Sequence, residues 1–82
     1  MAEVPLLSGR ALLRALAQIG YRPVRQRGSH IRLERHSEKD RHAITVPNHR
    51  EIAKGTLNDI VAAVSRATNR SKIELLAELR KT

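Results

Sequence analysis

The spacing of apolar residues changes along the chain and divides it into helix-like and strand-like segments. Between Gly9 and Ile19, leucine, isoleucine and alanine recur every three or four residues, which is the period of one helix face. Ser8 precedes this run as a candidate N-cap, and Gly20 follows it where a left-handed residue ends a helix. The pattern predicts a first helix from about Gly9 to Ile19.

Three short runs after this helix are typical of β-strands. They cover Tyr21 to Arg27, His30 to His36 and Arg41 to Val46. Gly28-Ser29 suits a two-residue type II′ hairpin turn, and the polar residues 37–40 form the second turn. Pro47 has no N–H donor and is expected to end the third strand.

The two turns predict a single register for the sheet. The first turn sets Val24 opposite Leu33, and the second sets Leu33 opposite Ile44. One face is therefore apolar and consists of Val24, Ile31, Leu33, Ile44 and Val46. The opposite face carries Arg25, Arg27, His30, Arg32, Glu34 and Thr45. The side chain of His30 is thus expected to point away from the helices.

Two more helices follow the predicted sheet. Helical spacing predicts the first from about Gly55 or Thr56 to Thr68. Ser71 and Glu74 form a capping box that opens a short terminal helix. That helix is marked by Ile73, Leu76 and Leu79. The order α-β-β-β-α plus a short helix predicts an α+β fold, with an antiparallel three-stranded sheet and helices on one face. No linker or repeat divides residues 1–82, which are expected to form a single domain.

The charge balance narrows the class of partner. Sixteen Lys and Arg residues against eight Asp and Glu residues give a net charge of +8, which favours a polyanion such as nucleic acid or an acidic protein. Tyr21 is the single aromatic residue, so base-stacking platforms like those of RNA-recognition motifs are not expected. Phosphate contacts should therefore supply most of the affinity for a nucleic acid.

The absence of cysteine excludes disulfides and thiolate metal sites. No apolar run is as long as a membrane span or a signal-peptide core. A soluble cytoplasmic protein with no membrane partner is the expectation from these two observations.

The most informative motif is Gly28-Ser29-His30 at the tip of the first hairpin. Arginines surround it in the sequence at positions Arg22, Arg25, Arg27, Arg32 and Arg35. Histidine titrates near neutral pH, and the guanidinium group pairs with phosphate through a planar fork of donors. This combination predicts acid–base chemistry on a phosphodiester with His30 as the reactive group. The alternative is a hairpin histidine that has no chemical role.

The other histidines are weaker candidates. His49 follows the third strand near the open end of the same sheet, as a second acid–base partner or as a structural or phosphate-contacting residue. His36 and His42 flank the far turn and are interpreted as solvated surface residues. No pair of histidines has the HExxH spacing, and no carboxylate pair accompanies them, so no metal site is expected.

Two further motifs are rejected as catalytic signatures. Lys54-Gly55-Thr56 lacks the upstream glycine of a phosphate loop, although a helix N-terminus at this point still favours an anion. Ser29 has no recognisable base and acid in the sequence around it, so a serine nucleophile is not expected.

Four segments, taken in order, resemble a known family. They are Gly20-Tyr21, Arg25-Gln26-Arg27-Gly28-Ser29-His30, Val46-Pro47-Asn48-His49 and Lys54-Gly55-Thr56-Leu57. As an ordered set they are similar to the HicA (YcfA-like) family of toxin mRNA interferases. The resemblance implies a double-stranded-RNA-binding-like fold and a ribonuclease that degrades mRNA without a metal or other cofactor. It places the essential histidine of the family on His30. Tyr21 stands where the family often has Phe.

The resemblance also implies a HicB-type antitoxin that binds the toxin and blocks this face, in a toxin–antitoxin hetero-oligomer. In the expected mechanism His30 acts as general base on a ribose 2′-hydroxyl or as general acid on the leaving oxygen. The residues expected to bind RNA are Arg25, Arg27, Ser29, Arg32, His49 and Lys54. The alternative function is a non-catalytic basic RNA-binding module that uses the same face. A DNA-binding or ribosome-associated protein ranks last, because the predicted sheet offers no recognition helix.

Overall fold

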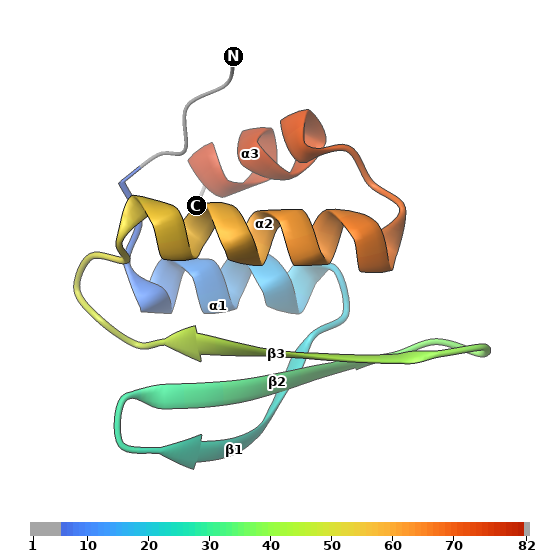
Figure 1. The fold of residues 1–82 in the computed structure, drawn as a ribbon, viewed down its shortest axis with the longest axis horizontal. Helices are drawn as coiled ribbons and strands as arrows, with labels where there is room; N and C mark the ends of the chain where they lie inside the picture. The colour runs from blue at the N-terminus through green and yellow to red at the C-terminus, as the bar shows by residue number, and fades with distance from the viewer. Residues whose placement is uncertain (1–5, 82) are drawn as a thin grey trace.

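Three antiparallel strands form a sheet that helices cover on one face (Figure 1). The computed structural model describes residues 6–81. Its elements are α1 (Gly9–Gln18), β1 (Arg22–Arg27), β2 (His30–His36), β3 (Arg41–Pro47), α2 (Lys54–Thr68) and α3 (Lys72–Arg80). The strand order is β1-β2-β3, so β2 is the central strand. The predicted α+β architecture is confirmed.

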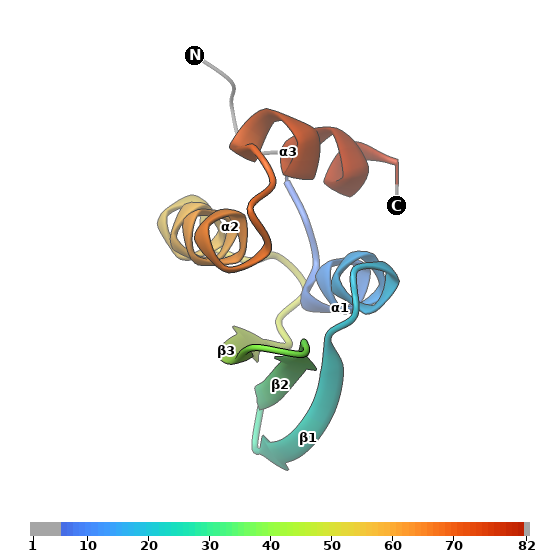
Figure 2. The ribbon, with the colours of Figure 1, turned by 90° about the vertical axis from the view of Figure 1, so that its right-hand side faces the viewer.

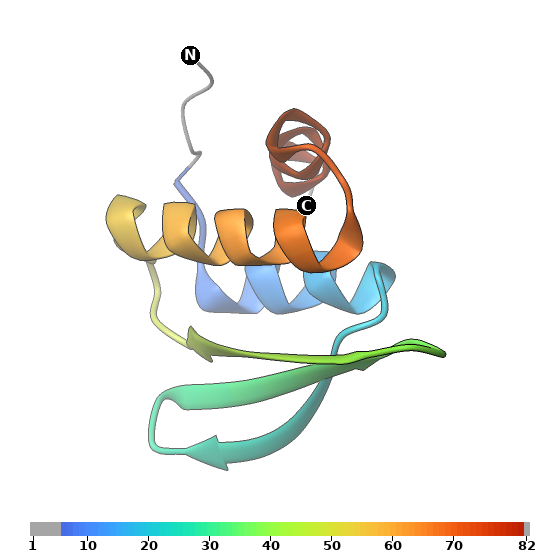
Figure 3. The same cartoon turned by 45° about the vertical axis from the view of Figure 1, so that its right-hand side comes forward.

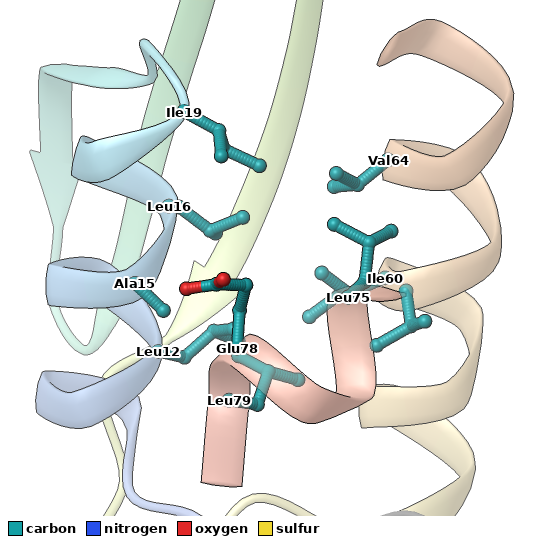
Figure 4. A pocket seen from close by; sticks show the side chains of 10 residues that line it. Leu12, Ala15, Leu16, Ile19, Ile60, Val64, Leu75, Glu78 and Leu79 are labelled. Atoms are coloured by element: carbon teal, nitrogen blue, oxygen red, sulfur yellow. The ribbon is translucent and has the colours of Figure 1, made fainter. Parts of the chain in front are cut away.

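The helices form two layers above the sheet. Helices α1 and α2 lie side by side over the strands, and α3 crosses them on the side away from the sheet (Figure 2, Figure 3). The core is aliphatic apart from Tyr21, which is 1% exposed. The three helices line a small apolar pocket of about 20 Å³, formed mainly by leucine, isoleucine and valine side chains (Figure 4). Because all three helices lie on the same side of the sheet, no helix of the described chain covers the opposite face of the sheet.

Local signals fix the ends of most elements. The Ser8 hydroxyl accepts a hydrogen bond from the amide of Ala11 at 3.1 Å, and Gly20 follows α1 with a φ of +102°. Ser71 caps α3 by accepting from the Glu74 amide at 3.1 Å. Helix α2 begins at Lys54, slightly before the predicted start, and its N-cap Ala53 offers no side-chain hydrogen bond.

The two hairpins follow the predicted turns. Gly28 has a φ of +59° while Ser29 does not have a positive φ, which fits a type II′ turn. In the second hairpin, Leu33 pairs with Ile44 and Ile31 pairs with Val46, as predicted. β3 continues one residue beyond the prediction, because Pro47 still pairs with His30 at the strand end, where its missing donor is tolerated.

The predicted place of Val24 on the apolar face is wrong. Pro23 pairs with Leu33 and Arg25 pairs with Arg32, so β1 advances two residues where β2 advances one. Val24 is the additional residue of this β-bulge, and 51% of its surface is exposed. The bulge therefore puts Pro23, rather than Val24, opposite Leu33.

Of the three residues that mark α3 in the sequence, Leu76 and Leu79 are buried, whereas Ile73 is 72% exposed and Leu75 is buried beside the other two. The interpretation of His42 as a solvated surface residue is wrong, because the residue is half-buried and its Nδ1 is hydrogen-bonded to the Tyr21 hydroxyl at 2.8 Å. Burial raises the pKa of the Tyr21 phenol, and the charge of Arg35 opposes that rise.

The loop after β3 is held against the start of α1. The Gly9 amide donates to the carbonyl of His49 at 2.8 Å, and the Ile52 amide donates to the carbonyl of Leu7 at 2.8 Å. A Cβ atom on Gly9 would lie 2.6 Å from both the Asn48 Cα and the Pro47 carbonyl oxygen. A glycine is thus required for this approach.

No helix within residues 6–81 has the length and apolar character to cross a membrane.

Candidate active site

The uncovered face of the sheet carries a hollow of about 180 Å³. Its lining consists of Arg25, Arg27, His30, Arg32 and Thr45. These residues come from all three strands, and Arg27 pairs with His30 while Arg32 pairs with Thr45. Because side chains alternate along a strand, burying Ile31 and Leu33 under the helices turns His30 and Arg32 outward. The structure thus brings together the histidine and three of the arginines that the sequence singles out.

The His30 ring is accessible. The residue is exposed, and within residues 6–81 its side chain has no hydrogen-bond or ion-pair partner. No acidic side chain is among the residues that line the hollow. Three guanidinium groups beside an accessible imidazole have the chemistry needed to hold a phosphate and to place a ring nitrogen next to it.

Glu34 is the carboxylate nearest to this cluster along β2. Its Oε2 lies 3.7 Å from Arg32 Nε, and its Oε1 lies 3.0 Å from His36 Nε2. The hydrogen bond from His36 lowers the pKa of the Glu34 carboxyl, and the charges of Arg41 and Arg32 act in the same direction. Because the side chain of Arg32 is 50% exposed, its long contact with Glu34 is weak and leaves it available to an anionic ligand.

A second pair of candidates meets at the end of the hairpin. Ser29 Oγ and His49 Nε2 are 3.3 Å apart, and the Asn48 amide donates to the Ser29 carbonyl at 2.6 Å. The sequence does not reveal this pair, because the two residues are far apart along the chain and meet only when β3 pairs with β2. Neither Ser29 nor His49 is among the lining residues of the hollow, so the two lie beside the arginine site rather than within it.

The Ser29–His49 pair does not form a catalytic triad. The 3.3 Å separation is longer than a strong hydrogen bond between a nucleophile and its base. No carboxylate of the described chain accepts a hydrogen bond from His49. The contact instead lies where the turn that carries His30 meets the loop after β3, and the hydrogen bond from the Asn48 amide to the Ser29 carbonyl joins these two segments.

Three cationic residues singled out in the sequence lie apart from the hollow. Lys54 is exposed at the start of α2, and Arg22 is at the far end of β1, opposite Glu34. Arg35 is directed toward the end of α1. Its Nε donates to the Ile19 carbonyl at 2.8 Å, so this guanidinium caps the end of α1. Thr45 lines the hollow although the sequence assigns it no role, and strand alternation in β3 is the signal that places it there.

No cluster of three His, Cys, Asp or Glu side chains suited to a metal ion occurs in the described part of the chain.

The sequence matches a known protein family. A family model described as the HicA toxin of bacterial toxin–antitoxin systems matches residues 9–65, which is more than half of the chain. The match extends from α1 into α2 and leaves α3 outside. No curated protein and no solved structure matches.

Proposed function

The chain belongs to the HicA toxin family of bacterial toxin–antitoxin systems, and on that premise we propose that it is a metal-independent endoribonuclease that cleaves mRNA with His30. The observation that carries this proposal is the hollow on the open face of the sheet. There an accessible imidazole shares one lining with Arg25, Arg27 and Arg32. Residues 1–82 act together in this proposal as one toxin domain in the cytoplasm, where mRNA is available.

The proposed reaction uses the ribose of the RNA as its own nucleophile. His30 accepts the proton of a 2′-hydroxyl, and the 2′ oxygen attacks the adjacent phosphorus. The bond from phosphorus to the 5′ oxygen breaks, and that oxygen takes a proton from water in the exposed hollow. The products are a 2′,3′-cyclic phosphate and a 5′-hydroxyl end. The imidazolium then returns its proton to the solvent.

The arginines have an electrostatic role in this reaction. The non-bridging oxygens of the phosphate gain negative charge as the 2′ oxygen attacks the phosphorus, and guanidinium donors stabilise that charge. Arg25 and Arg27 on β1 and Arg32 on β2 approach the phosphate from neighbouring strands. Ser29, His49 and Lys54 extend the proposed RNA contact beyond the hollow, at the end of the molecule where the first turn, the loop after β3 and the start of α2 lie (Figure 1).

The proposed protein partner is an acidic antitoxin of the HicB type. A chain with a net charge of +8 favours such a partner, and a protein that covers the hollow would keep RNA from His30. The toxin is then inactive within a toxin–antitoxin hetero-oligomer.

The first experiment measures cleavage of labelled single-stranded RNA in the presence of a chelator. The native chain is expected to cleave it, and His30→Ala is expected to lower the rate by about 10²- to 10⁴-fold, because it removes the acid–base group. His36→Ala is the matched control, since His36 is an exposed histidine at the other end of β2. It is expected to retain activity.

The products and a modified substrate test the mechanism. Cleaved RNA should carry a 2′,3′-cyclic phosphate, and an RNA with 2′-deoxyribose at the cleaved position should remain intact. Equal cleavage by the native chain and His30→Ala would contradict the assignment of His30. RNA binding by both proteins without cleavage by either would favour the non-catalytic RNA-binding module.

A further inference from the structure

A second and larger hollow lies on the other side of β1. It has a volume of about 510 Å³ and opens between α1, β1 and β2. It is lined by Leu13, Arg14, Ala17, Pro23, Arg25, Gln26, Ile31 and Leu33. This volume lies within the range of roughly 300–1,000 Å³ that is usual for small-molecule sites. We call it the α1–β1 groove.

The groove exists because β1 bends away from α1. Figure 2 shows β1 curving downward from the end of α1. The bulge at Val24 increases the local twist of the strand, and all six residues of β1 are exposed. The helix-facing side of β1 is therefore accessible, with Ile31 and Leu33 of β2 at the base of the groove.

Arg25 connects the groove to the hollow that contains His30. It is the one residue that lines both, because it stands directly after the bulge on the edge strand. A flexible chain that contacts Arg25 can thus lie across the edge of β1, with one part beside His30 and the next part in the groove.

The groove combines the groups that bind a nucleotide. Arg14 and Arg25 supply guanidinium groups, and no acidic side chain is among its lining residues. The base of the groove is apolar, and guanidinium planes stack on nucleobases in single-stranded RNA. Gln26 donates from Nε2 to the Gly28 carbonyl at 3.1 Å, which leaves its amide oxygen as an acceptor for a base edge.

We propose that the α1–β1 groove binds a nucleotide of the RNA next to the phosphate held at His30, with Arg14 and Gln26 as its recognition residues. This inference rests on the proposed ribonuclease function and adds a subsite to it. Charge complementarity between the arginine-lined walls and RNA, together with continuity through Arg25, favours RNA over a protein segment as the occupant.

The test measures binding of a labelled single-stranded dodecanucleotide RNA by fluorescence anisotropy. All proteins carry His30→Ala so that the RNA stays intact. Arg14→Ala is expected to weaken binding by about fivefold to tenfold, as for the loss of a base-contacting arginine. Arg66→Ala is the matched control, since Arg66 is an exposed arginine on α2 outside both hollows. Its effect should stay below about twofold, because exposed charges beyond a Debye length are screened.

A second pair of variants tests occupancy of the groove. Ala17→Glu places a carboxylate among the lining residues, and Gln18→Glu adds the same charge at the next, exposed position of α1. Only Ala17→Glu should weaken binding of the dodecanucleotide. Inorganic phosphate, which has no nucleoside to place in the groove, should bind both variants equally. Circular dichroism verifies that every variant is folded.

The outcomes separate the groove from the ribonuclease proposal. Equal binding by Arg14→Ala and Arg66→Ala, or by Ala17→Glu and Gln18→Glu, would overturn the subsite while leaving cleavage by His30 intact. If the native chain neither binds nor cleaves RNA, the ribonuclease proposal itself fails.

Discussion

Gly9 is the residue at which α1 comes closest to the loop after β3. A Cβ atom there would meet main-chain atoms of Pro47 and Asn48 at 2.6 Å, and main-chain atoms cannot rotate away as a side chain can. Gly9→Ala is therefore expected to destabilise the protein by about 1–3 kcal/mol, as overpacking does in other cores. Urea unfolding monitored by circular dichroism measures the loss.

Gly55 provides the matched control for this prediction. It lies in the first turn of α2, and a Cβ atom on it would have nothing within 4 Å. Gly55→Ala is expected to leave stability unchanged or raise it by up to about 1 kcal/mol, because alanine loses less conformational entropy in a helix. Equal free energies of unfolding for Gly9→Ala and the native chain would refute the close approach.

For single residues, the sequence predicts which side chains of β2 point away from the helices. It does not predict which residue of β1 pairs with Leu33. Pro23 and Val24 are both apolar, so the pattern fits either partner. The bulge decides between them, and it is a property of the paired strands rather than of one segment. The Ser29–His49 contact was missed for a related reason, since only the pairing of β2 with β3 brings these residues together.

Among the elements, α3 offers the sharpest test of packing. Leu76 is 4% exposed in the layer above α1 and α2, whereas Ile73 is 72% exposed in the first turn of the same helix. Leu76→Ala is expected to destabilise the protein by about 2–5 kcal/mol through lost burial and the cavity left behind. Ile73→Ala is expected to change stability by less than about 0.5 kcal/mol. Thermal unfolding measures the stability of both variants. Similar losses of stability in Leu76→Ala and Ile73→Ala would contradict the observed orientation of α3.

The elements themselves were largely predictable. Ser8, Gly20 and Ser71 mark helix ends through local hydrogen bonds and backbone preference, and the structure keeps all three. The buried face of α3 was not predictable from the spacing of Ile73, Leu76 and Leu79. A short helix with apolar residues on several sides can pack in more than one orientation. The positions of α1 and α2 decide which of its sides becomes buried.

For the molecule as a whole, a net charge of +8 means that its affinity for RNA should depend on salt concentration. The three arginines of the hollow should together contribute about −2 to the slope of the logarithm of affinity against the logarithm of salt concentration. Arg27→Ala should reduce the magnitude of that slope by about 0.7, since one phosphate contact is lost. Anisotropy titrations of the His30→Ala protein measure both slopes. Affinity that does not change with salt would rule out phosphate contacts as the basis of binding.

At this scale the sequence and the structure agree on which face of the sheet is open. The agreement follows from the two hairpin turns, since they set the alternation that sends Ile31 inward and His30 outward. The α1–β1 groove is a feature that the sequence does not reveal. It depends on the curvature of β1 relative to α1, and no spacing of residues encodes that angle.

The bulge in β1 also limits how another protein can attach to this edge of the sheet. Pro23 has no N–H group, and the register shift at Val24 breaks the regular series of main-chain groups that an added strand would need. An antitoxin that approaches along β1 would therefore have to recognise side chains rather than a regular series of main-chain groups. Such a contact would depend on the particular sequence of this toxin and not on the strand conformation alone.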